Sequence, residues 1–411
     1  MNITLNHRKY NGFLNAPPSK SIMQRFIAAA LLAKGESIIS NSDKSNDSKS
    51  ALKVAENLGA SIHYSNNNVH IEGTKGLKNT TINVGESGLG IRMFSPISAL
   101  FEEEITIIGE GSLKKRPLGM IKKPLEDLGA IVILNNNFLP VKIKGKLKGG
   151  KTIVDGSISS QFLTGLLFAL PMAENDSVLQ VIDLKSKPYI DLTIDVLSKF
   201  GIVIRHDDYK FFYIKGNQKY KATNYRIEGD WSSASFHIVG AAISGKVEIY
   251  GLDFNSKQAD KMILDAVKSF GADVIKGENL IIRKKNNQAF EFDATDCPDL
   301  FPPLAVLAAA ARGKSRIKGV GRLTHKESNR ALVIQKEFAK LGIEVEIEGD
   351  EMIINGGIPI GGQIISNNDH RIAMAGALMS LISANPVTII DSQAVNKSYP
   401  AFFEDFSQVV I

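Results

Sequence analysis

The chain has 411 residues, of which 44% are hydrophobic and 22% charged, which is typical of a folded globular protein and excludes a disordered or fibrous one. Its net charge of +6 favours an anionic partner, either a nucleic acid or a small phosphorylated molecule. The one cysteine, Cys297, excludes an internal disulfide and disfavours a thiolate metal site, so a reducing cytoplasm is expected.

The N-terminal segment MNITLNHRKYNGFL lacks the apolar region of a signal peptide, and no run of 18 apolar residues occurs in the chain. We therefore expect a cytoplasmic protein without a membrane span. A prior of about 150 residues per domain predicts two or three domains.

Six alanine-rich apolar segments recur along the chain, each opened by small, polar or charged residues. The segments start near Ser21, Gly88, Ser160, Ser233, Asp299 and Asp369. The intervals by subtraction are 67, 72, 73, 66 and 70 residues. Because these segments are apolar on nearly every side, we expect six helices that are buried all round. A serine before the third one is expected to cap that helix.

Amphipathic segments lie between these buried helices, and five of them close on a glycine. The glycines are Gly59, Gly129, Gly201, Gly271 and Gly342, at intervals of 70, 72, 70 and 71 residues. Glycine adopts the left-handed conformation that ends many helices, so these segments predict surface helices. A short strand-like segment, such as SIHYS or ADVIK, follows each of them.

The two series together predict six copies of a unit of about 70 residues, each with strands around one buried and one surface helix. The expected class is α/β, arranged as two domains of three units. We place one domain at residues 15–228 and the other at residues 1–14 plus 229–411, with the N-terminal strand returning to the second domain. Helix N-termini carry free N–H groups and partial positive charge, so three such ends facing the interdomain cleft from each side predict an anion site there.

Cations cluster at the equivalent places beside the helix starts. They are Lys20, Arg25, Arg92, Arg116, Lys326, Arg330, Arg371 and Lys397. Arginine binds phosphate and carboxylate groups bidentately, although a structural salt bridge is the alternative for each cation taken singly.

Two acids stand close to these cations, Asp299 in CPDLFPP and Glu327 in HKESNR. By default Asp299 is expected to cap a helix and Glu327 to lie in a first helical turn. In a cleft lined by cations, they are instead candidates for a general base and a general acid.

Signatures of other chemistries are missing from the sequence. No phosphate-binding P-loop, dinucleotide fingerprint, zinc-protease motif or nucleophile elbow occurs. The histidines have no ligand spacing, so no metal is expected; they are His7, His63, His70, His206, His237, His325 and His370. The basic segment Val141–Lys151 alternates like an exposed strand edge, which we prefer to an RNA-binding patch.

Ten motifs in order along the chain resemble the 5-enolpyruvylshikimate-3-phosphate synthase family. They extend from Pro17 to Pro400 and read PPSKSIMQR, ESGLGIR, KKRP, DGSISSQFLTGLL, SKPYID, EGDWSSAS, CPDLFPP, HKESNR, NDHRIAM and NKSYP. The resemblance implies an inside-out α/β barrel in two domains, each with three βαβαββ units. It also implies a monomeric transferase of the shikimate pathway, without cofactor or metal.

The reaction that the resemblance implies moves the enolpyruvyl group of phosphoenolpyruvate to the 5-hydroxyl of shikimate 3-phosphate, with release of phosphate. Motif positions assign shikimate 3-phosphate to Lys20, Ser21, Arg25, Ser159, Ser160, Gln161, Ser186, Tyr189, Asp299 and Lys326. They assign phosphoenolpyruvate to Lys20, Gly88, Arg116, Gln161, Arg330, Arg371 and Lys397. Asp299 is the implied base, Glu327 the implied proton donor, and Lys20 shares in proton transfer.

The sequence departs from the family pattern at two places. Glu86-Ser87-Gly88-Leu89 replaces the usual Asn-Ala/Ser-Gly-Thr, and Arg322 stands where a substrate-binding Asn is expected. One alternative is enolpyruvyl transfer to another acceptor such as UDP-N-acetylglucosamine, whose enzymes carry Lys-Asn where this chain has Lys20-Ser21. The other is binding of nucleic acid or a 3′-phosphate end, which an aromatic content of 7% disfavours because RNA recognition relies on stacking platforms.

Overall fold

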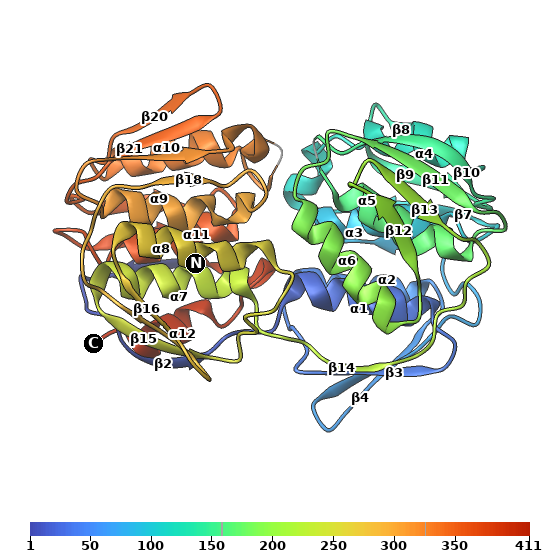
Figure 1. Cartoon of the computed structure of the whole chain (residues 1–411), viewed down its shortest axis with the longest axis horizontal. Coiled ribbons are helices and arrows are strands. Elements are labelled where there is room, and N and C mark those ends of the chain that lie inside the picture. The colour runs from blue at the N-terminus through green and yellow to red at the C-terminus, as the bar shows by residue number, and fades with distance from the viewer. Residues whose placement is uncertain (158, 325) are drawn as a thin grey trace. The chain divides into compact units, whose positions relative to one another are not determined.

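The computed structural model describes residues 1–157, 159–324 and 326–411, so His325 of the predicted histidine set lies outside the described residues (Figure 1). The chain divides into two compact units. Unit 1 is Met1–Pro17 with Glu228–Ile411, and unit 2 is Pro18–Ile227. Both units alternate strands and helices along the chain, which confirms the predicted α/β class.

Unit 2 contains three four-stranded sheets with one topology. Their strands are β3 (Glu36–Ser40), β4 (Ser61–Ser65), β5 (Asn68–Glu72), β6 (Thr81–Asn83), β7 (Glu104–Ile108), β8 (Ile131–Asn135), β9 (Phe138–Lys144), β10 (Gly150–Asp155), β11 (Ser177–Ile182), β12 (Ile204–Asp207), β13 (Phe211–Ile214) and β14 (Asn224–Arg226). The strand orders are β14-β3-β5-β4, β6-β7-β9-β8 and β10-β11-β13-β12. In each sheet the first two strands are parallel and the last two form an antiparallel hairpin.

Unit 1 repeats this plan in two sheets and shortens it in the third. Its strands are β1 (Asn2–Leu5), β2 (Asn11–Asn15), β15 (Lys246–Tyr250), β16 (Asp273–Lys276), β17 (Leu280–Arg283), β18 (Glu291–Asp293), β19 (Lys314–Lys318), β20 (Val345–Glu348), β21 (Glu351–Asn355), β22 (Gly362–Ile365) and β23 (Val387–Ile390). The strand orders are β16-β17-β15-β2, β18-β19-β21-β20 and β1-β23-β22.

Two sheets take their first strand from a distant part of the chain within the same unit. β2 pairs in parallel with β15, so the N-terminal segment supplies the first strand of the fourth repeat. β14 pairs in parallel with β3 and supplies the first strand of the first repeat from the end of unit 2. The chain therefore connects the two units twice.

The six helices expected to be buried all round are confirmed. They are α1 (Lys20–Leu32), α3 (Gly88–Ser98), α5 (Gln161–Ala169), α7 (Trp231–Ser244), α9 (Phe301–Ala309) and α11 (His370–Met379). Every residue of α3, α9 and α11 is buried. α3 and α5 pack so closely that a Cβ on Gly165 would lie 2.5 Å from the carbonyl oxygen of Arg92, so only glycine permits this approach.

The five glycine-terminated surface helices are confirmed as well. They are α2 (Asn46–Asn57), α4 (Lys122–Asp127), α6 (Lys187–Lys199), α8 (Ile263–Phe270) and α10 (Arg330–Lys340). The glycine that follows each helix has a positive φ between 78° and 107°, the left-handed conformation. In the last repeat the corresponding helix, α12 (Phe402–Val409), is followed by Val410 and not by a glycine. No helix in the described part of the chain is long and apolar enough to cross a membrane.

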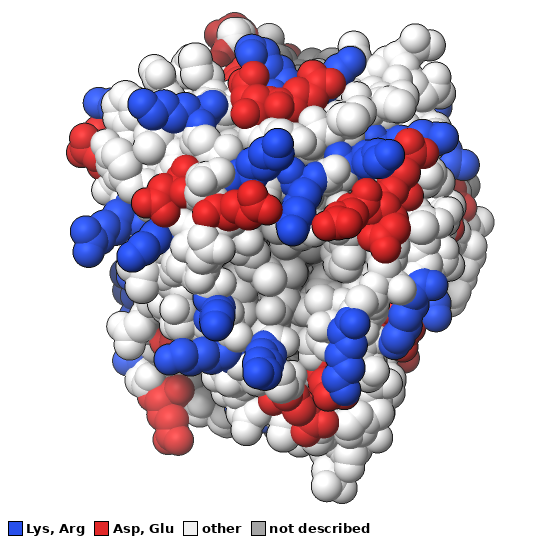
Figure 2. Space-filling model, turned by 90° about the vertical axis from the view of Figure 1, so that its right-hand side faces the viewer, with Lys and Arg blue, Asp and Glu red and all other residues white. Residues whose placement is uncertain are grey.

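The basic segment Val141–Lys151 is not the strand edge that its alternation predicts. Its first residues belong to β9, which lies inside a sheet between β7 and β8. Its last two residues begin β10, which is at the edge of another sheet. A period of two identifies a solvent-facing side, and an inner strand has such a side too. Lys142 on that side lies 3.2 Å from Glu104, so this cation is paired with an acid. On the face of the molecule drawn in Figure 2, Lys and Arg side chains are likewise interspersed with Asp and Glu.

A buried polar chain crosses the core of unit 1. His237 on α7 lies 2.6 Å from the Tyr10 hydroxyl through Nδ1 and 3.1 Å from the Tyr399 hydroxyl through Nε2. The Tyr399 hydroxyl in turn donates to Asp405 at 2.5 Å. Burial lowers the pKa of His237 to about 3, so the folded protein holds this imidazole neutral.

His237→Gln is expected to weaken the pH dependence of folding stability. The unfolded imidazole binds a proton below about pH 6.5 while the folded one stays neutral down to about pH 3, so falling pH favours unfolding in this window. Between pH 7 and pH 5 this group alone should cost the wild type about 2 kcal/mol of unfolding free energy. The measurement is urea unfolding at both pH values, followed by the fluorescence of Trp231, the single tryptophan, which is buried on the same helix. An equal loss in the variant would contradict this account.

Candidate active site

The start of α1 carries a buried cation in unit 2. The Arg25 side chain is 2% exposed and donates to Thr193 Oγ1 at 3.0 Å, to the Ser21 carbonyl at 2.8 Å and to the Tyr189 carbonyl at 3.4 Å. All three acceptors are neutral oxygens, and burial lowers the pKa of Arg25 to about 10. A buried guanidinium surrounded by neutral acceptors is a strong site for an anionic group.

Hydrogen bonds tie the three helix starts of unit 2 to one another. Ser87 caps α3 by accepting from Gly90 N at 3.0 Å, and it donates to Gln24 of α1 at 2.9 Å. Arg92 of α3 donates to Gln161, the first residue of α5, at 3.2 Å. The N-termini of α1, α3 and α5 therefore converge, which concentrates their partial positive charge in one place.

Gly88 and Arg116 are in close contact beside this convergence. A Cβ on Gly88 would lie 2.3 Å from Arg116 Nη1, so a larger residue at position 88 would displace the guanidinium from its present place. Arg116 itself is 8% exposed. Lys20, the first residue of α1, forms an ion pair with Asp47 of α2 at 2.9 Å.

Two serines, Ser159 and Ser160, precede α5, and the structure shows which of them caps the helix. Ser159 Oγ accepts from Gln161 N at 3.2 Å, so Ser159 provides the cap expected from one of these serines. Ser160 is buried, yet its side chain forms no cap hydrogen bond. Ser186 has a left-handed backbone (φ 56°) directly before α6 and is also buried, one turn ahead of Tyr189.

In unit 1 a single arginine gathers three carboxylates. Arg330 donates from Nε to Asp369 at 2.7 Å, from Nη1 to Asp299 at 2.7 Å and from Nη2 to Glu327 at 2.5 Å. Asp299 also accepts from Arg371 at 3.0 Å and from Lys326 at 3.3 Å. Asp369 completes the network by capping α11 through Arg371 N at 3.0 Å.

This network sets the protonation of Asp299. Burial raises the pKa of Asp299, but Arg371, Lys326 and Arg330 outweigh burial and hold the pKa well below its ordinary value. Burial lowers the pKa of Lys326. Asp299 is therefore an ionised carboxylate in the free protein and is able to accept a proton.

The default structural predictions for the two acids are wrong. Asp299 lies in a short 3-10 turn, Pro298–Leu300, ahead of α9 and does not cap that helix. Glu327 precedes the first turn of α10, which begins at Arg330 and is capped by Asn329. Both carboxylates accept a hydrogen bond from the same arginine, Arg330.

Sequence reasoning missed two acids near the predicted residues. Asp47 pairs with Lys20 from the first turn of α2, where an acid reads as an ordinary helix-start residue. Asp260 is fully buried and accepts from the Ser232 hydroxyl, and its Oδ1 has no hydrogen-bond partner among the described residues. Burial and then the charge of Asp299 raise the pKa of Asp260 to about 6. No motif marks Asp260 in the sequence.

The predicted residues thus form two groups, one in each unit. In unit 2 the structure brings together Lys20, Ser21, Arg25, Gly88, Arg116, Ser159, Ser160, Gln161, Ser186 and Tyr189 around the starts of α1, α3, α5 and α6. In unit 1 it brings together Asp299, Lys326, Glu327, Arg330 and Arg371. Lys397 is buried at the end of a 3-10 segment, Ser392–Lys397, that packs on α11. Arg322 lies in the 3-10 turn Val320–Leu323, just ahead of Lys326.

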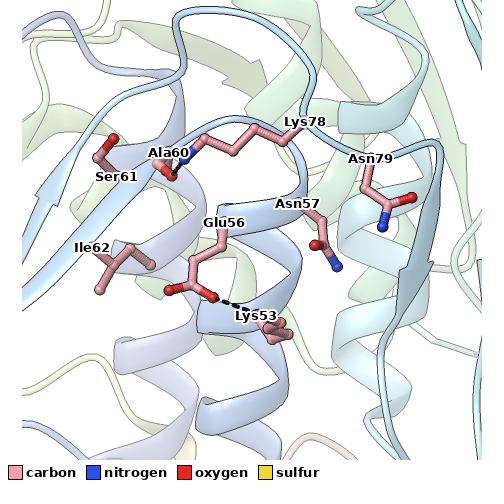
Figure 3. A pocket seen from close by; sticks show the side chains of 8 residues that line it. All are labelled: Lys53, Glu56, Asn57, Ala60, Ser61, Ile62, Lys78 and Asn79. Atoms are coloured by element: carbon pink, nitrogen blue, oxygen red, sulfur yellow. Dashed lines mark hydrogen bonds and ion pairs between the residues drawn. The ribbon is translucent and has the colours of Figure 1, made fainter.

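A surface pocket of about 480 Å³ in unit 2 is a different feature (Figure 3). It lies beside α2 and the start of β4, and none of the predicted substrate-binding residues lines it. Its cations are engaged, since Lys53 pairs with Glu56 at 3.1 Å and Lys78 donates to the Ala60 carbonyl at 2.7 Å. We do not assign substrate to it.

Comparisons with a family model, with individual sequences and with solved structures all match the same family of proteins. Residues 6–406 match the family described as EPSP synthase (3-phosphoshikimate 1-carboxyvinyltransferase). The 3-phosphoshikimate 1-carboxyvinyltransferase of Clostridium novyi is 40% identical, with 99% of this chain and 97% of that protein covered. The enzyme of the same name from Clostridium kluyveri is 39% identical, with 98% and 96% covered.

The solved structure of EPSP synthase from Acinetobacter baumannii matches with a TM-score of 0.83 and 28% identity, covering 100% of this chain and 98% of the other. This match agrees with the predicted inside-out α/β class. Because the family match and the relatives extend over nearly the whole sequence, the chain belongs to the EPSP synthase family.

Proposed function

We propose that this protein transfers the enolpyruvyl group of phosphoenolpyruvate to the 5-hydroxyl of shikimate 3-phosphate and releases phosphate. The observation that carries the proposal is the gathering of the family's motif residues around helix N-termini and buried cations in both units. Both substrates carry several negative charges and repel each other in water. Fixed cations and helix ends offset this repulsion and hold the reacting atoms in position.

Shikimate 3-phosphate is assigned to the group in unit 2. Arg25 offers a guanidinium whose present acceptors are all neutral oxygens, so a carboxylate or phosphate gains a charge-assisted hydrogen bond there. Ser159 and Ser160 lie at the start of α5 and Ser186 at the start of α6, where hydroxyls and helix N–H groups suit an anion.

Phosphoenolpyruvate is assigned to arginines of both units. Arg116 lies against Gly88, while Arg330 and Arg371 surround Asp299. Lys20, Gln161 and Lys397 complete the set. The residues proposed for phosphoenolpyruvate therefore come from both units.

The proposed reaction is an addition followed by an elimination. Glu327 donates a proton to the methylene carbon of phosphoenolpyruvate, which makes the neighbouring carbon electrophilic. Asp299 accepts the proton of the 5-hydroxyl as its oxygen attacks that carbon. The tetrahedral adduct then loses phosphate, and a proton returns from the methyl group to the enzyme as the alkene forms again.

The arginine network connects substrate binding to the proposed base. In the free protein Arg330 helps to hold the pKa of Asp299 below its ordinary value, and it also donates to Glu327. An anion that takes up the guanidinium weakens the effect on Asp299, so Asp299 becomes a better base. The scheme needs no metal, cofactor or covalent enzyme intermediate. A monomeric state in the cytoplasm is part of the same proposal.

The acceptor decides between the two enolpyruvyl transfer reactions. We expect phosphate release from phosphoenolpyruvate in the presence of shikimate 3-phosphate and none with UDP-N-acetylglucosamine. A continuous phosphate assay on the purified protein makes the comparison. Absence of turnover with shikimate 3-phosphate would overturn the proposed function, and salt-dependent oligonucleotide binding undisturbed by that compound would favour the nucleic-acid alternative.

Glu327→Gln is expected to lower kcat by about 10²-fold or more, because the amide cannot deliver the proton. Substrate binding, followed by titration calorimetry, should be largely kept since the amide preserves the shape of the side chain. Glu351→Gln is the matched control, because Glu351 also accepts from an arginine of unit 1, Arg316, at 3.2 Å. Unchanged turnover in the Glu327 variant would refute its role as the acid.

A further inference from the structure

Two histidines and a glutamate lie together on one face of the first sheet of unit 2, and the proposed reaction uses none of them. They are Glu36 on β3, His63 on β4 and His70 on β5. A ligand atom of each residue lies within 4.8 Å of those of the other two, and no other group of this kind occurs in the described parts of the chain.

The hairpin register explains how residues seven positions apart come together. Asn66 and Asn67 both have positive φ, 50° and 62°, and form the two-residue turn between β4 and β5. This turn places His63 directly opposite His70. The two imidazole rings stack with centroids 4.5 Å apart and planes 19° from parallel.

The neighbouring strand adds the carboxylate on the same face. β3 pairs with β5 so that Glu36 is opposite Glu72, two positions along the strand from His70. Residues two apart on a strand share a face. Glu36 Oε2 lies 3.3 Å from His70 Nδ1, and Glu36 Oε1 lies 3.8 Å from His63 Nε2.

These distances are close to those of a metal site. Zinc bound tetrahedrally at about 2.0–2.1 Å holds its ligand atoms about 3.3 Å from one another. The contact between Glu36 and His70 already has this length, the contact between Glu36 and His63 is longer at 3.8 Å, and all three ligand atoms lie within 4.8 Å of one another. The side chains of Glu36 and His63 are 44% and 60% exposed, so they are free to move closer to each other.

A simple ion pair explains only part of this arrangement. Glu36 and His70 alone would satisfy such a pair, whereas the structure turns a second imidazole nitrogen toward the same carboxylate. Two imidazoles and one carboxylate are the protein ligands of many zinc sites, with water at the open position. Imidazole favours zinc, copper and nickel, whereas magnesium and calcium prefer all-oxygen sites.

We propose that Glu36, His63 and His70 bind a divalent transition-metal ion of the zinc class. The ion links three adjacent strands of the sheet that packs against α1, and so it stabilises unit 2. The absence of ligand spacing in the sequence does not exclude this site, because the turn sets the geometry across two strands.

Zinc titration of the full-length protein tests the proposal. We expect one Zn²⁺ per chain in isothermal titration calorimetry at pH 7.5, not displaced by millimolar Mg²⁺. His63→Ala and Glu36→Gln should each weaken binding about 10-fold or more, since even residues outside the ligand set change metal affinity by about 10-fold to 100-fold. Zn²⁺ should raise the thermal midpoint of the wild type and not that of either variant. Shikimate-dependent turnover should be unchanged in both variants, which separates this test from that of the proposed function.

His206→Ala is the matched control. His206 occupies the third position of β12, as His63 does in β4, but the residue opposite it is Phe212. Its removal should leave Zn²⁺ affinity unchanged. The proposal is overturned if His63→Ala or Glu36→Gln binds Zn²⁺ as tightly as the wild type, or if His206→Ala loses as much affinity as they do. Because His63 and Glu36 are exposed, circular dichroism of both variants should match the wild type.

Discussion

A helix that is buried on every side has only its ends available for polar chemistry, and six such helices determine where this protein places its charges. The apolar bodies of α1, α3, α5, α7, α9 and α11 admit few charged groups except near their first turns. Arg25, Arg92 and Arg371 all lie within six residues of a helix start, where the unpaired N–H groups are also found. The fold therefore collects anion-binding groups at the helix starts within each unit.

The two groups of residues balance their charge in different ways. In unit 1 Arg330 already contacts three carboxylates, so an incoming anion has to exchange partners with them. In unit 2 the acceptors of Arg25 among the described residues are neutral oxygens, so an anion there adds a partner. Loss of Arg330 as a partner moves the pKa of Asp299 back towards its ordinary value, whereas an added partner at Arg25 mainly contributes binding energy. This difference agrees with the proposed roles of Asp299 as the base and of Arg25 as a substrate-binding residue.

The sequence predicts what depends on local periodicity and fails where partners are distant. The buried helices and the left-handed glycines follow from residues within one or two helical turns of each other, and both predictions are confirmed. The basic strand is inside a sheet and not at its edge, because alternation says nothing about the neighbouring strands. Asp299 was expected to cap a helix, but it pairs with Arg330, 31 positions along the chain. Ion pairs between groups so far apart in the sequence leave no periodic signal.

The repeat also explains why one sheet carries a candidate metal site and its equivalents do not. The third position of the first strand in the hairpin is His63 in the first repeat, Ile133 in the second and His206 in the third. The residues opposite are His70, Lys142 and Phe212. The backbone brings each pair together in the same way, but only the first pair supplies two metal ligands. Because the repeats share one backbone plan, side-chain differences at equivalent positions give each repeat its own chemistry.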